Sequence, residues 1–334
     1  MISYPRLIIF LLIFLGPLVS VHSAVGLEKK FKVMVVMSYE ASYPWVAEVR
    51  QGIESVIGNS CTLKYTYLNT KTNRRAGPGR AKEAYEEYKV FMPDGVIVSD
   101  DDAQSMFLVP YLKDRVSTPV MFCGVNAEPE AYGYPASNVS GVLEREPMKE
   151  SLLFLKQLVP SVGTFGLVIE KSPTGMAVQK QLEEEADQYP VRFIGTRMAH
   201  TMEEAVTAVK EFRESCDALI YITMEGITGP LGRSLSDKEI LPVLSEIFKK
   251  PIFTNAQYRV HYGALGAVVK TGQEHGVLSS EMLLKAMKGT PVSELAITRN
   301  NFGRRILNVD VLKKLEINPK PFLVRSATLV RTEE

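Results

Sequence analysis

Residues 93–104 read PDGVIVSDDDAQ, in which a short apolar strand, Gly95–Ser99, runs directly into three aspartates. Similar apolar runs recur along the chain, for example KVMVVM (32–37) and PVMFC (119–123), and amphipathic helical patterns separate them. Strands without polar alternation are typical of a parallel sheet whose two faces are both covered by helices. The sequence therefore predicts an α/β fold.

The alternation of strands and helices occurs in two successive units. The first ends with an irregular stretch, residues 124–138, and the second begins with a helix over residues 147–158. Two capping boxes, Thr201–Glu204 and Ser236–Glu239, support the predicted helices of the second unit. The last strands are too few for a third domain, so we expect them to cross back and complete both sheets.

The expected architecture is two doubly wound Rossmann-like lobes joined by a hinge of crossing strands. A chain of 334 residues is long enough for two such lobes with sizeable cores. We assign residues 30–140 plus 270–299 to the first lobe and residues 141–269 plus 300–330 to the second. The cleft between two such lobes is the expected place for a ligand.

The composition excludes several classes of function. The 39 Lys and Arg residues are balanced by 38 Asp and Glu residues, whereas a nucleic-acid partner would require a basic face. The chain has only four histidines and three cysteines, which leaves few residues for a zinc site or for histidine-dependent catalysis. We therefore expect no nucleic-acid partner, no metal site and no cofactor.

Residues 1–24 have the pattern of a secretory signal peptide. Arg6 precedes an apolar run over residues 7–21, and the small residues Ser23 and Ala24 follow it. The run is short for a membrane span of about 20 residues, although a retained anchor is the alternative. We predict an exported protein, periplasmic or otherwise extracytoplasmic.

The candidate site residues follow the predicted strands, because ligands of open α/β sheets bind beyond the carboxyl ends of the strands. In the first unit these residues are aromatic, acidic or polar: Ser38, Tyr39, Tyr43 and Trp45, then Asp100, Asp101 and Asp102, then Gly124 and Asn126. Aromatic faces can stack on a ring or hold a cation. One aspartate is expected to cap a helix, and the others can receive an amine or hydroxyls. The alternative for Trp45 is that it only packs a helix on the sheet.

In the second unit the corresponding positions are Ser172, Thr174, Gly175, Glu225, Asn255 and Tyr258. Two kinds of binding loop can be excluded from their spacing, a phosphate-binding loop in the second unit and a calcium-binding loop in the first. The glycines at 226, 229 and 232 match no phosphate-binding spacing. A calcium loop from Asp100 would need glycine and glutamate where Ser105 and Tyr111 stand.

Several of these stretches also resemble a known family when they are taken together and in order. They are PDGVIVSDDDAQ (93–104), PVMFCGVNA (119–127), NVSGVLE (138–144) and the segment 263–289. They resemble the ABC transporter substrate-binding family of the type I periplasmic-binding-protein fold. SYEASYPWVAEVRQGI (38–53) is most similar to a branch that also serves as the sensor region of histidine kinases.

This resemblance implies ligand capture between two lobes with hinge closure, and no catalysis. The chain departs from the members that bind aromatic amino acids, because Asp100–Asp102 stand where those members carry small hydroxyl residues. We therefore do not carry over the amino-acid ligands of the family.

Three functional hypotheses follow. The first is an exported, monomeric solute-binding protein that captures a small organic ligand bearing an amine or several hydroxyls and presents it to an ABC permease. The second is a ligand-sensing module for a separate membrane receptor kinase. The third is a hydrolase that uses Asp101 and Glu225 as paired carboxylates. Because no recognised catalytic spacing occurs, we expect no enzyme and no catalytic residues.

Overall fold

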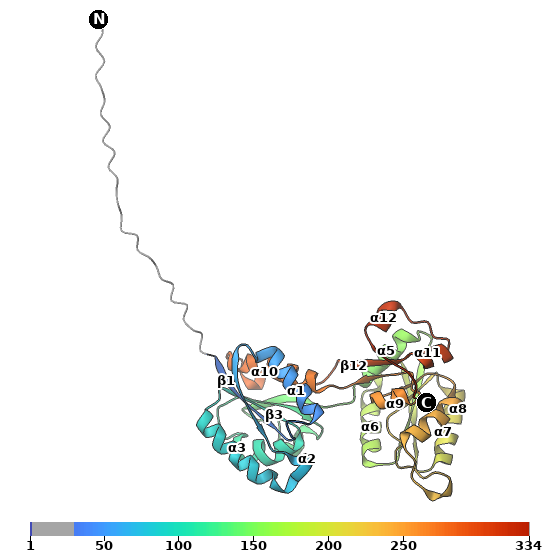
Figure 1. The fold of residues 1–334 in the computed structure, drawn as a ribbon, viewed down its shortest axis with the longest axis horizontal. Coiled ribbons are helices and arrows are strands. Elements are labelled where there is room, and N and C mark those ends of the chain that lie inside the picture. Colours follow the sequence, from blue (N-terminus) through green and yellow to red (C-terminus); the bar gives the residue numbers. More distant parts are fainter. Residues whose placement is uncertain (2–29, 334) are drawn as a thin grey trace. The chain divides into compact units, whose positions relative to one another are not determined.

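The computed structural model describes Met1 and residues 30–333 of the chain. Apart from Met1, the expected signal peptide lies outside these residues. Two sheets with helices on both faces make up the part from Phe31 onward (Figure 1). The predicted fold class is therefore confirmed. Among the described residues, no helix is long and apolar enough to cross a membrane.

The first sheet has six strands in the order β11-β5-β4-β3-β1-β2, and all of its pairs are parallel. Its strands are β1 (Phe31–Met37), β2 (Cys61–Tyr67), β3 (Gly95–Ser99), β4 (Val120–Val125), β5 (Val139–Leu143) and β11 (Thr298–Arg299). Its helices are α1 (Pro44–Ile57), α2 (Thr70–Asn73), α3 (Gly77–Phe91), α4 (Asp101–Ala103) with a π-helical continuation (Gln104–Leu112), and α10 (Gly272–Met287).

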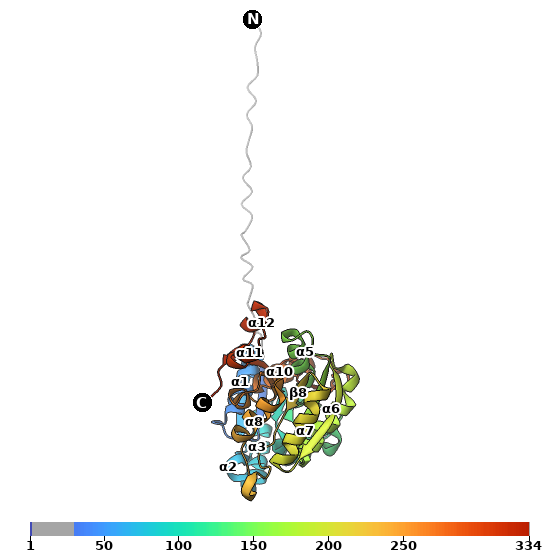
Figure 2. The same ribbon diagram turned by 90° about the vertical axis from the view of Figure 1, so that its right-hand side faces the viewer.

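Alternate residues of β1 explain why helices cover both faces of this sheet. Met34 and Val36 pack into one core with residues of α3, whereas Val33, Val35 and Met37 pack into another with α1 and α10. A strand that is apolar on both sides has to be buried on both sides. Helix α10 lies against α1 in both views (Figures 1 and 2).

The second sheet has seven strands in the order β13-β12-β10-β9-β8-β6-β7, with β10–β12 as its antiparallel pair. The strands are β6 (Thr164–Glu170), β7 (Arg192–Ala199), β8 (Ala218–Tyr221), β9 (Ile252–Thr254), β10 (Gly266–Val269), β12 (Arg304–Asn308) and β13 (Thr328–Val330). The helices are α5 (Met148–Leu158), α6 (Pro173–Glu184), α7 (Met202–Ser215), α8 (Asp237–Phe248), α9 (Gln257–His261), α11 (Val309–Lys314) and α12 (Pro321–Arg325).

The chain passes between the two sheets at three places. These are the segments after β5, between β10 and α10, and between β11 and β12, so the predicted crossing strands are confirmed. The last crossing is anchored by Glu274, whose carboxylate accepts the backbone N–H groups of Phe302 at 2.8 Å and Gly303 at 2.9 Å. The lobe boundaries expected from the sequence stay a prediction.

Candidate functional site

A pocket of about 420 Å³ lies where the carboxyl ends of strands from both sheets come together, a volume typical of small-molecule sites. We call it the strand-end pocket. It is lined by Tyr39, Tyr43, Trp45, Lys71, Asp100, Asn126, Glu144, Asn255, Ala256, Gln257, Val269 and Lys270. Of the predicted site residues, it contains Tyr39, Tyr43, Trp45, Asp100, Asn126 and Asn255.

Two tyrosines form an aromatic wall that already holds a cation. The rings of Tyr39 and Tyr43 meet edge to face with their centroids 5.2 Å apart. The Nζ atom of Lys71, from α2, lies 4.3 Å from the centroid of Tyr39 and 5.3 Å from that of Tyr43. Tyr43 directly precedes α1, where Pro44 occupies the first turn and fixes the backbone angle with which the helix begins.

Asp100 is the buried acid of the pocket, with 3% of its surface exposed. The Ser99 hydroxyl donates to Oδ2 at 2.7 Å, whereas no described residue makes a hydrogen bond of normal geometry to Oδ1. Burial raises the pKa of Asp100 to about 8, and the nearby Glu144 and Asp101 carboxylates add to this effect, while Ser99 and Trp45 oppose it. Asp100 has a φ of +69°, a strained conformation for a residue other than glycine.

Gly124, a predicted site residue, lies behind this carboxyl. Its φ is also +69°, and a Cβ atom here would lie 3.0 Å from Asp100 Oδ1. Glycine therefore leaves room for the carboxyl. The Gly124 N–H donates to Nδ1 of the fully buried His275 at 3.3 Å. Burial, with a contribution from Lys270, lowers the pKa of His275 to about 3.

Trp45 packs on the His275 ring, with the ring centroids 5.3 Å apart. Its indole N–H is buried and makes no hydrogen bond of normal geometry, although a weak polar contact with Asp100 lowers the pKa of that carboxyl. Trp45 therefore both packs a helix and lines the pocket. The buried indole N–H and the Asp100 carboxyl therefore face each other, with only this weak contact between them.

The other two aspartates of the cluster have structural partners. Asp101 accepts the backbone N–H groups of Asn126 at 3.0 Å and Ala127 at 3.2 Å, and the Tyr132 hydroxyl at 2.8 Å. Asp102 pairs with Arg74 at 2.8 Å. Neither lines the strand-end pocket. Asp101 instead positions Asn126, which does.

Ser38 and Ser172 also have internal roles. The buried Ser38 hydroxyl donates to the Ser99 carbonyl at 2.7 Å and accepts the Ala103 N–H at 2.8 Å, which ties β1 to α4. Ser172 caps α6 by accepting the N–H of Gly175 at 3.1 Å, as its position before Pro173 predicts.

The remaining predicted residues of the second unit lie apart from the strand-end pocket. A Cβ atom on Gly175 would lie 2.2 Å from the Glu170 carbonyl, so this glycine serves close packing. Thr174 lines a neighbouring cavity of about 520 Å³, which shares Asn126, Glu144 and Lys270 with the strand-end pocket. Glu225 and Tyr258 are exposed and line neither cavity.

The sequence model of the ABC transporter substrate binding protein family matches residues 92–330. The chain belongs to this family. No curated protein sequence matches the chain significantly.

Three solved structures share the fold of this chain. The ligand-free, open structure of CD0873, a substrate binding protein with adhesive properties from Clostridium difficile, has a TM-score of 0.64 at 18% identity over 91% of this chain and 100% of that one. An ABC domain in complex with L-Trp from Streptococcus pneumonia has a TM-score of 0.50 at 18% identity over 90% and 100%. A mutant XylFII–LytSN complex has a TM-score of 0.53 at 10% identity over 81% and 96%.

Sequence reasoning missed the charged residues that this family member brings to the pocket from its crossing segments. Lys270 Nζ lies 2.8 Å from Glu144 and 3.0 Å from Glu146. Burial opposes the charge on Lys270, but Glu146 and Glu144 together raise its pKa. Both segments are recognisable as crossing strands, and that signal could have pointed to these residues. Lys71 was missed because the short helix α2 has no apolar periodicity.

Asn255 is held in place by a buried network behind the pocket. Its Oδ1 atom accepts from Arg259 at 2.6 Å, and Arg259 in turn pairs with Asp237 at 2.6 Å. The Tyr221 hydroxyl completes the network by donating to Asp237 at 2.5 Å. Because its oxygen is occupied, Asn255 offers the pocket its amide N–H groups.

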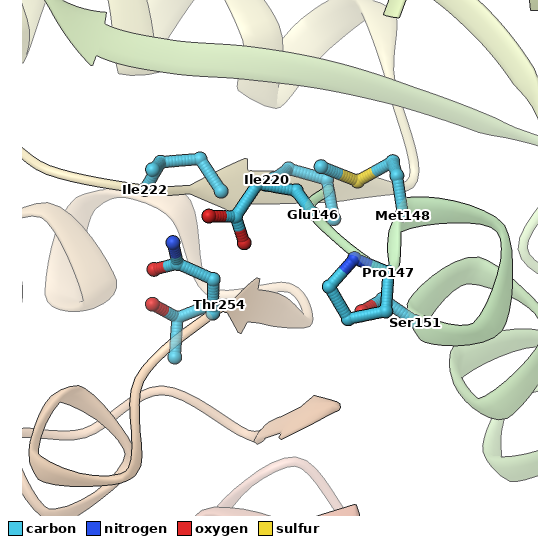
Figure 3. Close-up of a pocket in the computed structure, with 8 residues that line it drawn as sticks. Glu146, Pro147, Met148, Ser151, Ile220, Ile222 and Thr254 are labelled. Carbon is cyan, nitrogen blue, oxygen red and sulfur yellow. The ribbon is translucent and has the colours of Figure 1, made fainter. Parts of the chain in front are cut away.

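A small cavity next to Asn255 separates the crossing segment from β8 and β9 (Figure 3). In Figure 3 the Glu146 carboxylate extends into the space between Ile222 and Thr254. Glu146 Oε2 and Thr254 Oγ1 are buried there, and neither has a hydrogen-bond partner within the described part of the chain. The free volume of about 10 Å³ is that of about one water molecule, so this cavity is too small for an organic ligand.

Proposed function

We propose that the protein is an exported solute-binding protein that captures a small organic ligand in the strand-end pocket and presents it to an ABC importer. The observation that carries this proposal is that one pocket draws its lining from both sheets, in a chain of the substrate-binding family. A ligand that touches both lobes stabilises the closed arrangement, since only that arrangement provides all of its contacts.

In this proposal each group in the pocket has a role in binding and none has a role in catalysis. Tyr39, Tyr43 and Trp45 provide aromatic surface, and Asp100 and Asn126 provide polar anchors from the first lobe. Asn255 provides amide donors from the second lobe. The paired-carboxylate alternative loses support, because Asp101 is fully engaged by the 126–132 loop and Glu225 lines neither cavity.

Export through the N-terminal segment is the second part of the proposal. Cleavage near Ser23 or Ala24 would release the mature protein outside the cytoplasm. Intact mass measurement of protein recovered from the envelope or the medium tests this. Recovery of the uncleaved chain from the membrane fraction would favour a retained anchor.

A signalling output is the alternative use of the same binding chemistry. The mutant XylFII–LytSN complex is a fold neighbour that has been solved with a second protein, and the 38–53 segment is similar to sensor regions. Affinity capture of membrane proteins with and without ligand separates the two outputs. A ligand-dependent permease supports transport, and a ligand-dependent kinase supports sensing.

Mass spectrometry of small molecules released from gently purified protein tests the proposed function. We expect a stoichiometric organic molecule that changes the fluorescence of Trp45, the only tryptophan, when it is added back to stripped protein. Asn126→Ala should weaken this response, and Tyr258→Phe, outside the pocket, should leave it unchanged. A bare inorganic anion, or no ligand and no response, would contradict the proposal.

A further inference from the structure

We propose that the strand-end pocket is selective for an organic cation, whose ammonium or guanidinium group pairs with Asp100 and takes the place of Lys71 against the tyrosine rings. This inference rests on the proposed solute-binding function and names the ligand class of the same pocket. It is carried by the geometry of Asp100, by the charges around it and by the position of Lys71.

Asp100 is a buried carboxyl that, as far as the structure describes the chain, lacks a cationic partner. Asp100 lines the pocket and is 3% exposed, and its Oδ2 accepts from Ser99. Among the described residues no hydrogen bond of normal geometry reaches Oδ1, and Trp45 adds only a weak polar contact. Its positive φ is strained, and the missing side chain of Gly124 gives its carboxyl the space it needs. Burying an incompletely paired carboxyl is unfavourable for folding, so a ligand of opposite charge is the natural complement.

The charged groups around Asp100 favour a ligand with a positive charge. Burial raises the pKa of the Tyr39 hydroxyl, and the charged groups that raise it further are all acidic, namely Asp100, Asp102, Asp101 and Glu144. Glu144 is matched by Lys270 and Asp102 by Arg74, which leaves Asp100 as the carboxyl without a basic partner in the pocket. A cation beside Asp100 would favour the ionised carboxylate and pair with it, whereas an anion would favour the protonated form and gain no ion pair.

Lys71 shows that this wall already attracts a cation. Its ammonium group lies over both tyrosine rings, and within the described residues no carboxylate lies at ion-pair distance from it. Its side chain is exposed and comes from the short helix α2, so it can leave the rings. A ligand cation would use the same aromatic faces and would gain the Asp100 contact as well.

The competing interpretation makes the opposite prediction for Lys71. If the ligand is anionic or zwitterionic, Lys71 would hold its carboxylate, and loss of Lys71 would weaken binding. If the ligand is a cation, Lys71 competes with it, and loss of Lys71 would strengthen binding. Substitution of this one residue therefore distinguishes the two classes of ligand.

Isothermal titration calorimetry with three compounds of similar shape tests the inference. The probes are tyramine (cationic), 4-(2-hydroxyethyl)phenol (neutral) and 3-(4-hydroxyphenyl)propionate (anionic). We expect tyramine to bind at least tenfold more tightly than the other two. Asp100→Asn should abolish this preference, Lys71→Met should tighten tyramine binding three- to tenfold, and the control Lys82→Met, on the exposed surface of α3, should change nothing.

Equal or tighter binding of the neutral or anionic probe, or weaker tyramine binding by Lys71→Met, would overturn the inference. Lys71→Met keeps the test valid even if Asp100→Asn does not fold. If none of the three probes binds, the charge of the ligand released from purified protein decides. A released cation supports the inference, and a neutral or anionic ligand overturns it but leaves the solute-binding function intact. The absence of any ligand contradicts the function itself.

Discussion

Folding favours the protonated form of Asp100, whereas the proposed cationic ligand would pair with its ionised form. Burial raises its pKa from 3.8 to about 8, and the Glu144 and Asp101 carboxylates add to the increase. The folded state therefore favours the protonated form of this carboxyl. Its contribution to stability is present below pH 3.8 and is lost as the pH rises to about 8.

Asp100→Asn should therefore stabilise the ligand-free protein at neutral and mildly basic pH. The gain relative to wild type grows with pH, by up to about 1.4 kcal/mol per pH unit between pH 4 and 8. Thermal unfolding of both proteins at pH 4, 6 and 8 measures this gain. A difference in melting temperature that does not depend on pH would contradict the explanation.

The contribution of His275 to stability should depend on pH in the opposite direction. Its pKa is lowered from 6.5 to about 3 by burial and by Lys270, so the folded state disfavours the charged ring. The associated stability is present above pH 6.5 and is lost as the pH falls toward 3, at up to about 1.4 kcal/mol per pH unit. Urea unfolding between pH 4 and 7 should show a smaller loss in His275→Gln, whose amide can still accept from Gly124. Equal losses in both proteins would contradict this assignment.

At the scale of elements, the contact between α1 and α10 depends on glycines that let the two helices approach closely. A Cβ atom on Gly276 would lie 2.1 Å from the Val49 carbonyl, and one on Gly52 would lie 2.1 Å from that of Gln273. Both obstacles are backbone atoms, so no side-chain movement can relieve them. This contact also holds His275 and Trp45 against each other behind the pocket.

Gly276→Ala should destabilise the protein by about 1–3 kcal/mol, the usual range for overpacking. Gly79→Ala in α3 is the matched control, because nothing lies within 4 Å of its added Cβ atom and alanine is the better helix former. Chemical denaturation should place Gly276→Ala below wild type and Gly79→Ala at or slightly above it. Equal stability of the two variants would show that the helices can separate at little cost.

At the scale of the whole molecule, the proposed function requires the two lobes to move about the crossing segments. The Glu144–Lys270–Glu146 cluster belongs to two of these segments and also borders the strand-end pocket. A ligand cation near Glu144 would compete with Lys270 for this carboxylate. Ligand binding and hinge position would then be coupled through one side chain.

Small-angle X-ray scattering tests this coupling. Adding back the released ligand should reduce the radius of gyration of the wild-type protein, because closure brings the two lobes together. Asp100→Asn at the same ligand concentration should keep the ligand-free value. A radius that stays constant despite saturated binding would mean that the pocket fills without closure.

Sequence reasoning predicted the α/β class, the order of the main strands and longer helices, and the end of the sheet where the pocket lies, but not the short helices α2 and α9. These follow from apolar runs and helical periodicity, which are local properties of the chain. The same reasoning correctly located helices such as α7 and α8, whose starts carry the predicted capping residues. It also selected Tyr39, Trp45 and Asp100, because every parallel strand ends at the same edge of its sheet.

Which of these side chains enter the pocket depends on the three-dimensional fold. Asp100 and Asp101 are neighbours in the chain, yet the positive φ of Asp100 directs one carboxyl to the pocket while the 126–132 loop occupies the other. Lys71, Glu144 and Lys270 come together from distant segments. Side-chain direction depends on backbone angles and on long-range contacts, and neither is encoded in the hydrophobic pattern of a single chain.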